Sequence, residues 1–260
     1  MKKQNESFAK LLRSFDYHFD SRTVFDDFLT MTLCAFSPNP RTGQSHDEAL
    51  YIETIAKYSK SDLRHQFPNM LAKLVVEMEE RLESDSGNDV LGEYYEENLR
   101  QKGSSQFFTP WHICEFMATI TMGESEKMED GNPLRVLDPC CGSGRMLVAG
   151  AKVNSPDHEY YGIDIDLTCV KMTALNLFLN GVFGGEVMNA DALAPDDFRQ
   201  SYHLSFMPFG IFRIEQKEKS RLWHLHKNSF NASPPLSSVL LPSEMKDGKV
   251  DWSGSQLKIF

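Results

Sequence analysis

The chain has 260 residues, a formal net charge of −10, 41% hydrophobic residues and 25% charged residues. This length suits one large domain, or a core domain with a helical attachment, and the composition is ordinary for a soluble globular protein. The acidic balance argues against a stand-alone DNA-binding protein, which normally has a basic surplus, and no apolar run approaches the roughly 20 residues of a membrane helix.

Residues 1–105 have the pattern of a helical domain. Four segments carry apolar residues at mixed spacings of three and four, which is typical of amphipathic helices. They are "FDDFLTMTLCAF" (25–36), "DEALYIETIAKY" (47–58), "NMLAKLVVEMEERLE" (69–83) and "VLGEYYEENLRQ" (90–101). We therefore predict an all-helical N-terminal domain that ends near residue 105.

From residue 106 the pattern changes to alternating helices and strands with short connections. The segment "FFTPWHICEFMATI" (107–120) predicts a turn that opens a helix, with Pro110 at the first helical position. The predicted strands and helices that follow are strand 134–138, helix 144–153, strand 160–165, helix 167–181, strand 184–191 and strand 202–207. This alternation predicts an α/β fold with a parallel, doubly wound, Rossmann-like sheet.

The pattern is weaker after residue 210. Residues 213–230 indicate a charged helix or loop, residues 237–242 a fifth strand, and residues 244–260 a hairpin around "DGK". We assign residues 106–260 to one domain, whose C-terminal end is short for a complete enzyme of this fold.

The stretch "DPCCGSG" (138–144) is the strongest candidate for a binding site. It follows the first predicted strand directly, and ligands of open α/β sheets bind at the carboxyl ends of the strands. Glycines in such a loop let the backbone approach a ligand closely. The alternative for this loop alone is a tight turn without a ligand.

Two further acids favour the binding site. Asp164 lies at the end of the second strand, at the offset where this architecture hydrogen-bonds a ribose diol, and Asp191 lies at the end of the third strand. Together with Asp138, they place three carboxylates on one edge of the predicted sheet. Because uncompensated carboxylates repel one another, this edge implies a ligand that offers cations or hydrogen-bond donors.

The type of nucleotide follows from the charge of the loop. A cofactor with phosphates prefers "GxGxxG" and helix-terminal amides without carboxylates nearby. Here an acid directly precedes the glycines, which favours a cofactor without phosphate that carries an ammonium group. S-adenosylmethionine fits this description, and NAD is the weaker alternative.

The cysteines indicate a reducing compartment. The number of cysteines is odd, and their spacing is not that of a disulfide framework, which indicates free thiols in the cytoplasm. The five are Cys34, Cys114, Cys140, Cys141 and Cys169. No CxxC or HxxxH set accompanies them, so we predict no metal site. Cys140 and Cys141 are interpreted as small residues that pack the turn, not as nucleophiles.

The set of motifs resembles the adenine-specific DNA methyltransferases that modify amino groups, and most of all the modification (M) subunit of type I restriction-modification systems. "QFFTP" (106–110) resembles the family's "GxFFTP", "DPCCGSG" its "DPxCGSG", "GIDID" (162–166) its "GxEID", and "NADAL" (189–193) its "xGDxL". The resemblance covers residues 106 to about 210, and "FFTP" together with "DPxCGSG" is a specific joint signal.

The resemblance implies roles for individual residues. The methionine end of the cofactor would contact the first motif, Asp164 would bind the ribose, Ile165 would flank the adenine, and Asp191 would meet the adenine amino group. The cofactor-binding residues implied in this way are Phe107, Phe108, Thr109, Pro110, Asp138, Pro139, Cys140, Gly142, Ser143, Gly144, Asp164, Ile165, Asp191 and Ala192.

The family's fourth motif, "NPPF", is degenerate in this chain. In the family, its asparagine accepts hydrogen bonds from the target amine at the end of the fourth strand, and its aromatic residue stacks on the flipped base. When "HLSFMPFG" (203–210) is aligned on Pro208 and Phe209, the asparagine position is Phe206 and the first proline is Met207. Phenylalanine has no acceptor, and the loss of one such polar group typically costs about a hundred- to a thousandfold in rate.

The sequence therefore predicts a protein that binds S-adenosylmethionine, belongs with the DNA adenine-N6 methyltransferases and is impaired in catalysis. The first alternative is an active methyltransferase that needs a specificity partner, and the weaker one is an NAD-dependent enzyme. The resemblance implies that DNA is reached through a separate specificity subunit, in agreement with the acidic charge. We expect a cytoplasmic protein without metal or membrane, in a homo- or hetero-oligomer.

Overall fold

The computed structural model describes residues 7–39, 45–82, 87–100, 107–122, 133–194, 196–232 and 257–259. Most of the described residues up to residue 100 are helical, as predicted. Their helices are α1 (Phe8–Arg13), α2 (Ser21–Ala35), α3 (Glu48–Ala56), η1 (Asp62–His65), α4 (Gln66–Leu82), α5 (Val90–Tyr94) and the π-helical turn η2 (Tyr95–Leu99).

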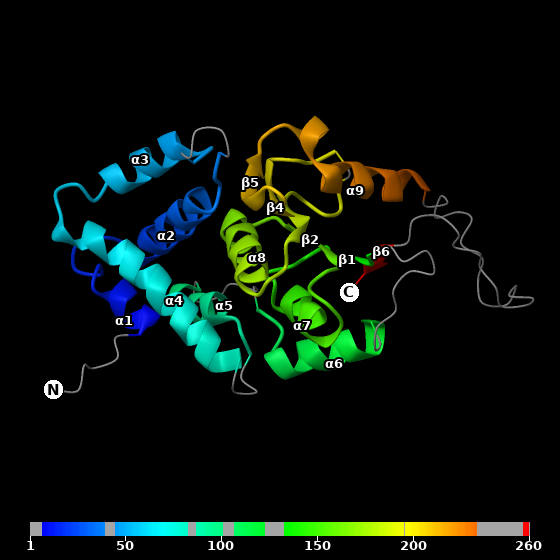
Figure 1. Cartoon of the computed structure of the whole chain (residues 1–260), viewed down its shortest axis with the longest axis horizontal. Helices are drawn as coiled ribbons and strands as arrows, with labels where there is room; N and C mark the ends of the chain where they lie inside the picture. Colours follow the sequence, from blue (N-terminus) through cyan, green and yellow to red (C-terminus); the bar gives the residue numbers. More distant parts are fainter. Residues whose placement is uncertain are drawn as a thin grey trace, which may run out of the picture.

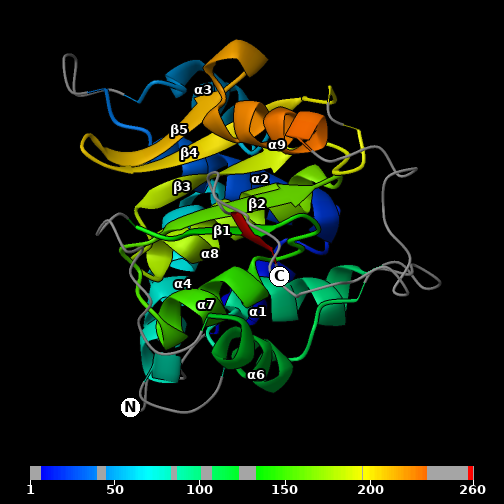
Figure 2. The ribbon, with the colours of Figure 1, turned by 90° about the vertical axis from the view of Figure 1, so that its right-hand side faces the viewer.

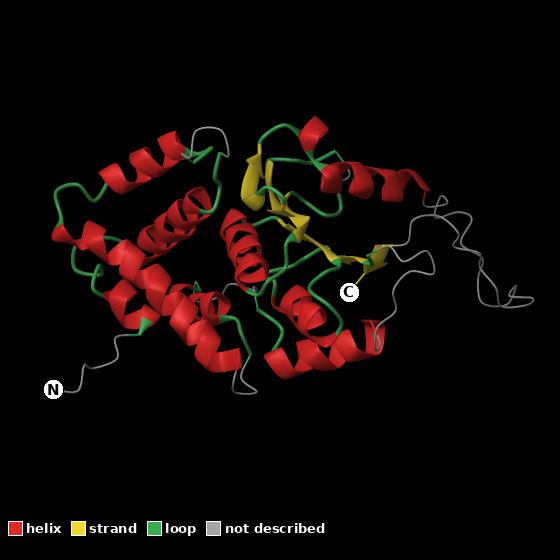
Figure 3. Ribbon diagram, viewed as in Figure 1, coloured by secondary structure: helices red, strands yellow, loops and turns green. Residues whose placement is uncertain are grey.

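The remaining described residues form a six-stranded sheet with four helices of at least nine residues and one 3₁₀ turn (Figures 1 and 3). The strands are β1 (Arg135–Asp138), β2 (Glu159–Asp164), β3 (Gly184–Asn189), β4 (Gln200–Phe206), β5 (Phe209–Ile214) and β6 (Leu257–Ile259). The helices are α6 (Trp111–Met122), α7 (Arg145–Val153), α8 (Leu167–Leu179), the 3₁₀ turn η3 (Lys217–Lys219) and α9 (Arg221–Ala232).

The sheet has the strand order β5-β4-β3-β2-β1-β6 (Figure 2). β1, β2 and β3 pair in parallel, with Val136 opposite Tyr160 and Ile163 opposite Met188, and β6 pairs in parallel with β1. The predicted Rossmann-like α/β fold is confirmed for these strands. α6 begins at Trp111, one residue later than predicted.

The last part of the sheet differs from the prediction because β4 runs antiparallel to β3, and β5 antiparallel to β4. A parallel connection needs a crossover of about a dozen or more residues, usually with a helix. The chain between β3 and β4, residues 190–199, is too short for this and returns directly. The sequence missed β5, and the fifth strand predicted at 237–242 and most of the hairpin predicted at 244–260 lie outside the described residues.

Alternate side chains of the strands pack against helices on the two faces of the sheet. On one face, Val136, Tyr160 and Val187 belong to a core that continues through α8 into the N-terminal helices. On the other face, Leu137, Tyr161, Ile163 and Met188 pack with Leu222 and Trp223 of α9. Figure 1 shows α8 between the N-terminal helices and the strands, with α9 on the opposite side.

Polar contacts also join the N-terminal helices to α8. The buried Lys171 ammonium lies 2.8 Å from the Asp26 carboxylate of α2, and Asn88 donates to the side-chain oxygen of Asn180 at 2.6 Å. The predicted domain boundary at 105/106 falls within residues 101–106, outside the described residues, and stays a prediction.

Candidate ligand pocket at the carboxyl edge of the sheet

The glycine loop joins β1 to α7 at the carboxyl edge of the parallel strands. Gly142 and Gly144 have φ angles of +56° and +83°, in the left-handed region that favours glycine. A Cβ atom on residue 142 would lie 2.8 Å from Cδ1 of Phe108, so glycine also permits the close packing of this ring. The predicted strand–loop–helix unit is therefore present, and the backbone conformation at residues 142 and 144 explains why both are glycine.

The amide groups of this loop are engaged within the protein. Cys140 N donates to Oδ1 of Asp138 at 3.0 Å, Gly142 N donates to Oδ2 of Asp164 at 2.9 Å, and Cys141 N donates to the carbonyl of Ile163 at 2.9 Å. A phosphate-binding loop instead leaves such amides for the anion. The loop thus presents carboxylates to a ligand where a phosphate site would present N–H donors.

The second and third strands bring the other two predicted acids to the same edge. Asp164 also accepts a hydrogen bond from Asp166 N at 2.8 Å, and Asp191 accepts one from Leu193 N at 2.9 Å. The side-chain amide of Asn189 donates to the carbonyls of Asp164 and Ile165, at 3.0 and 2.9 Å, which fixes the ends of β2 and β3 relative to each other.

Burial at this edge disfavours the charged form of the acids. It raises the pKa of Asp138 to about 6, with the hydrogen bond from Cys140 opposing the rise and the charge of Asp164 adding to it. Burial also raises the pKa of Asp164, against the hydrogen bonds from the amides of Asp166 and Gly142. A cation in the pocket would stabilise both carboxylates.

The thiol of Cys140 shows the same environment. Burial raises its pKa, and the charges of Asp138, Asp164 and Asp191 raise it further. Reactive cysteines need the opposite, a pKa lowered by positive charge. This agrees with the interpretation of Cys140 as a wall residue and not a nucleophile.

These residues surround a cavity of about 870 Å³, which is in the usual size range of small-molecule sites. Twelve of the fourteen predicted cofactor residues line it: Phe107, Phe108, Thr109, Asp138, Pro139, Cys140, Gly142, Ser143, Asp164, Ile165, Asp191 and Ala192. Pro110 and Gly144 are not lining residues, because Pro110 lies where α6 begins and Gly144 packs against Thr173 of α8.

The sequence did not single out seven further lining residues: Cys114, Cys141, Arg145, Met146, Asp166, Ala190 and Leu193. Cys141, Asp166, Ala190 and Leu193 lie inside the quoted motifs, and Arg145 and Met146 directly follow one, so the motifs taken as whole segments would have found most of them. Three apolar side chains around the pocket are largely exposed: Phe107 at 71%, Ile165 at 61% and Leu193 at 85%. Exposed apolar side chains of this kind suit contact with a purine face.

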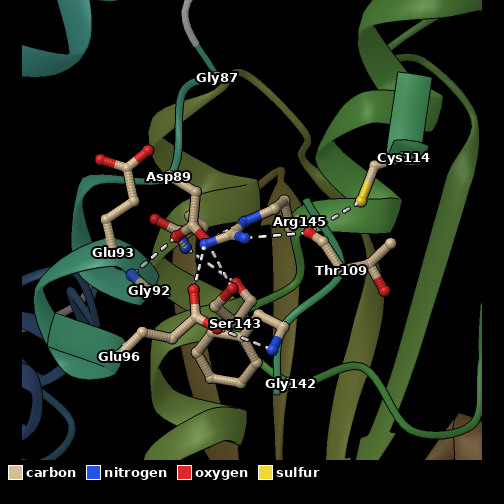
Figure 4. A network of polar contacts seen from close by, with 12 residues as sticks. Gly87, Asp89, Gly92, Glu93, Glu96, Thr109, Cys114, Gly142, Ser143 and Arg145 are labelled. Atoms are coloured by element: carbon tan, nitrogen blue, oxygen red, sulfur yellow. Dashed lines mark hydrogen bonds and ion pairs between the residues drawn. The ribbon is translucent and has the colours of Figure 1, made fainter. Parts of the chain in front are cut away.

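A buried polar network braces one wall of the pocket (Figure 4). The Asp89 carboxylate, at the start of α5, accepts hydrogen bonds from Ser143 Oγ at 2.6 Å and from Arg145 Nε at 2.8 Å. Arg145 also donates to the carbonyl of Thr109 at 2.9 Å and to Glu96 at 3.2 Å. Arg145 is the one Arg or Lys among the described lining residues, and its charge is met by two carboxylates. The pocket is therefore acidic overall.

The structure contradicts the predicted location of the degenerate fourth motif. Because β4 is antiparallel, Ser205 pairs with Gly184 at the start of β3, so the turn from Phe206 to Phe209 lies at the opposite edge of the sheet from the pocket. At about 3.3 Å per residue, the length of β3 separates the two by roughly 17 Å.

The aromatic side chains of this turn pack against α8 and against Phe183, which precedes β3. The Phe209 ring lies 4.9 Å from the ring of Phe178 of α8, and Phe206 lies 6.0 Å from Phe183, measured between ring centres. Phe206, Pro208 and Phe209 do not line the pocket. The structure therefore places these residues away from the pocket, and their catalytic role stays a prediction.

Within the described ranges, no group of three or more His, Cys, Asp or Glu side chains is placed to hold a metal ion. None of the helices in those ranges is long and apolar enough to cross a bilayer.

A Rossmann-like sheet with a pocket at the carboxyl edge of its strands is the arrangement in which open α/β proteins bind ligands. The sequence pattern of the N-6 DNA Methylase family matches residues 86–223, more than half of the chain, and the chain belongs to this family. Members of the family use S-adenosylmethionine as the methyl donor.

Individual relatives agree with this assignment. The chain is 30% identical over 114 residues to the type I restriction enzyme MpnII methylase subunit of Mycoplasma pneumoniae, covering 42% of this chain and 20% of that protein. It is 28% identical over 140 residues to the type II methyltransferase M.VspI of a Vibrio species, covering 51% and 32%. The chain thus spans about a fifth to a third of the length of these curated relatives.

A solved structure shows a weaker similarity. The methyltransferase subunit of a type I restriction-modification system from Streptococcus thermophilus is 18% identical, with a TM-score of 0.37, and the similarity covers 73% of this chain and 57% of that one.

Proposed function

We propose that this chain binds S-adenosylmethionine in the pocket between the glycine loop, the ends of β2 and β3, and the segment 107–109. The main support is the hydrogen bonding of the loop, where Asp138 and Asp164 occupy the amides that a phosphate would need. A ligand with an ammonium and a sulfonium group satisfies these acids. NAD, with two phosphates, is disfavoured for the same reason.

The division of the pocket follows the order of the motifs. The methionine end lies near Phe108, Thr109 and Asp138, the ribose near Asp164, and the adenine between Ile165 and the segment from Asp191 to Leu193. Each of these residues lines the cavity.

We propose further that the chain alone does not transfer a methyl group to DNA. The described lining residues include no asparagine or glutamine that would accept hydrogen bonds from an adenine amine. The motif aligned with the acceptor lies at the other edge of the sheet. Under this proposal, the chain acts in the cytoplasm as a subunit that needs a partner for catalysis, for DNA recognition or for both, and its charge of −10 favours a partner that holds the DNA.

The competing proposal is an active enzyme that lacks only a specificity subunit, because the family match and the intact pocket favour it as much as they favour an inactive subunit.

Titration calorimetry with S-adenosylmethionine, its demethylated product and NAD tests the first proposal, the binding of S-adenosylmethionine. We expect binding of the first two alone, and binding of NAD alone would refute the assignment of the ligand.

Transfer of tritiated methyl groups to plasmid DNA tests the second proposal. We expect no transfer above background by the purified chain. Transfer by the chain alone would show that an acceptor group reaches the pocket in a way that the described residues do not provide.

A further inference from the structure

We infer that Asp89 is a positioning residue, which couples the docking of the N-terminal segment 89–99 to the shape of the ligand pocket. This inference rests on the proposed function of that pocket. Asp89 does not line the pocket. Its carboxylate nevertheless holds residues on two walls of the pocket, either directly or through Arg145.

The Asp89 carboxylate is 1% exposed, and each of its oxygens accepts two hydrogen bonds. Oδ1 accepts from Gly92 N at 2.8 Å and from Asn176 Nδ2 of α8 at 2.7 Å. Oδ2 accepts from Ser143 Oγ at 2.6 Å and from Arg145 Nε at 2.8 Å. One side chain thus joins the start of α5, the glycine loop, the start of α7 and α8.

Arg145 extends the connection to the second wall. Its guanidinium donates to the Thr109 carbonyl at 2.9 Å and to Oε2 of Glu96 at 3.2 Å, while Oε1 of Glu96 accepts from Phe108 N at 2.9 Å. The segment 107–109 is therefore fixed to the loop through groups of the N-terminal region. Figure 4 shows Asp89, Ser143, Arg145 and Glu96 converging between the two walls.

The contacts predict a reciprocal effect. A ligand that needs the walls in this arrangement also stabilises the docked segment 89–99, because coupling between two sites acts equally in both directions. A carboxylate with a purely structural role would affect stability alone. The ion pair of Asp26, which is 37% exposed, with the buried Lys171 provides that comparison, because it also joins an N-terminal helix to α8, at 2.8 Å, and neither residue lines the pocket.

The experiment compares Asp89→Asn with the matched control Asp26→Asn. Asparagine retains one acceptor oxygen but turns an N–H₂ group toward the donors that surround the second oxygen of Asp89. It also removes the negative charge that faces the buried guanidinium of Arg145. We expect Asp89→Asn to weaken binding of S-adenosylmethionine about tenfold, within the usual range of coupling between sites. We expect Asp26→Asn to destabilise the fold and to leave the dissociation constant within about twofold of the original chain.

Hydrogen exchange of the ligand-free proteins provides a second measurement. In Asp89→Asn, we expect faster exchange of the amides of Phe108 and Gly142, on both walls, and in Asp26→Asn no change there. Unchanged affinity together with unchanged exchange at these amides would overturn the inference. The exchange measurement needs no ligand, so it tests the role of Asp89 independently of binding. Failure of the original chain to bind S-adenosylmethionine would refute the proposed function but not the role of Asp89.

Glu96→Gln is the second variant in case Asp89→Asn does not fold. The Glu96 side chain is 24% exposed and lies at the outer end of the network, so its loss disturbs the core less. We expect weaker binding and faster exchange at Phe108 with little change at Gly142. Affinity and exchange equal to those of the original chain would contradict the coupling.

Discussion

The replacement Gly142→Ala tests whether the shape of the pocket requires a glycine at position 142. The backbone at Gly142 has a φ angle of +56°, which costs an alanine about 1–2 kcal/mol. A Cβ atom there would lie 2.8 and 2.9 Å from Cδ1 and Cε1 of Phe108, whereas carbon atoms normally pack at about 3.5–4.0 Å. The ring must therefore move by about 1 Å.

This movement has a cost that can be counted from the contacts of Phe108. The ring stacks on Tyr95, with centres 5.9 Å apart and planes at 27°, and the Arg145 guanidinium lies 5.7 Å from its centre. Weakening these contacts costs about 1–2 kcal/mol in addition to the backbone strain. We expect Gly142→Ala to lower the free energy of unfolding by about 2–4 kcal/mol and, because Phe108 lines the pocket, to weaken ligand binding about tenfold.

Gly181→Ala is the matched control. Gly181 has a φ angle of +83° after α8, and a Cβ atom there would have no neighbour within 4 Å. We expect a loss of about 1–2 kcal/mol from strain alone and an unchanged affinity. Urea unfolding at constant slope and titration calorimetry measure the two quantities. Equal losses of stability and equal affinities for the two variants would refute the argument that the Phe108 ring can keep its place only when residue 142 has no side chain.

Three further predictions concern the pocket, the turn and α9. Affinity for S-adenosylmethionine should fall between pH 7 and pH 5, because Asp138, with a pKa raised to about 6, becomes neutral and no longer attracts a cation; a dependence that persists in Asp138→Asn would assign it to another group. The double variant Phe206→Asn with Met207→Pro should gain no methyl transfer in the tritium assay, since the turn lies at the opposite edge of the sheet from the pocket. Glu186→Gln should lower the free energy of unfolding by about 1–3 kcal/mol, measured in urea, with little change in affinity, because this buried carboxylate accepts from Ser220 Oγ and two amides at the start of α9.

The sequence predicted the helical N-terminal region, the three parallel strands and most of the pocket wall. These features have local signals, since a strand, a glycine loop and a helix follow one another within about 20 residues. The carboxyl ends of parallel strands then meet at one edge without further information. Asp138, Asp164 and Asp191 come together for that reason.

Other features have no such local signal. Asp89 lies in the stretch "SDSGND", whose composition indicates only a turn, and its partners Ser143, Arg145 and Asn176 are 54, 56 and 87 residues away. Such contacts depend on how α5 docks against α7 and α8. Spacing in the sequence does not encode that docking.

The direction of β4 had a signal that motif alignment concealed. The alternation of strands and helices predicts a parallel fourth strand, and the match of "MPFG" to half of the "NPPF" motif agreed with a motif at the carboxyl end of that strand. The ten residues between Asn189 and Gln200 are too few for a helical crossover, so the connection length alone favours a direct antiparallel return. Where a partial motif and a connection length disagree, the length is the stronger constraint because it follows from geometry.

The short return explains how the chain keeps a ligand pocket without the acceptor motif. The loop after β3 carries the adenine side of the proposed site, and the later elements hold it in place. His226 of α9 contacts the Ala192 carbonyl at 2.9 Å, Lys227 pairs with Asp196 at 2.8 Å, and Arg199 donates to the Ile165 carbonyl at 2.9 Å. Under the proposed function, the described residues after β3 support the binding of a nucleoside, and the group that accepts the amine of adenine comes from outside them.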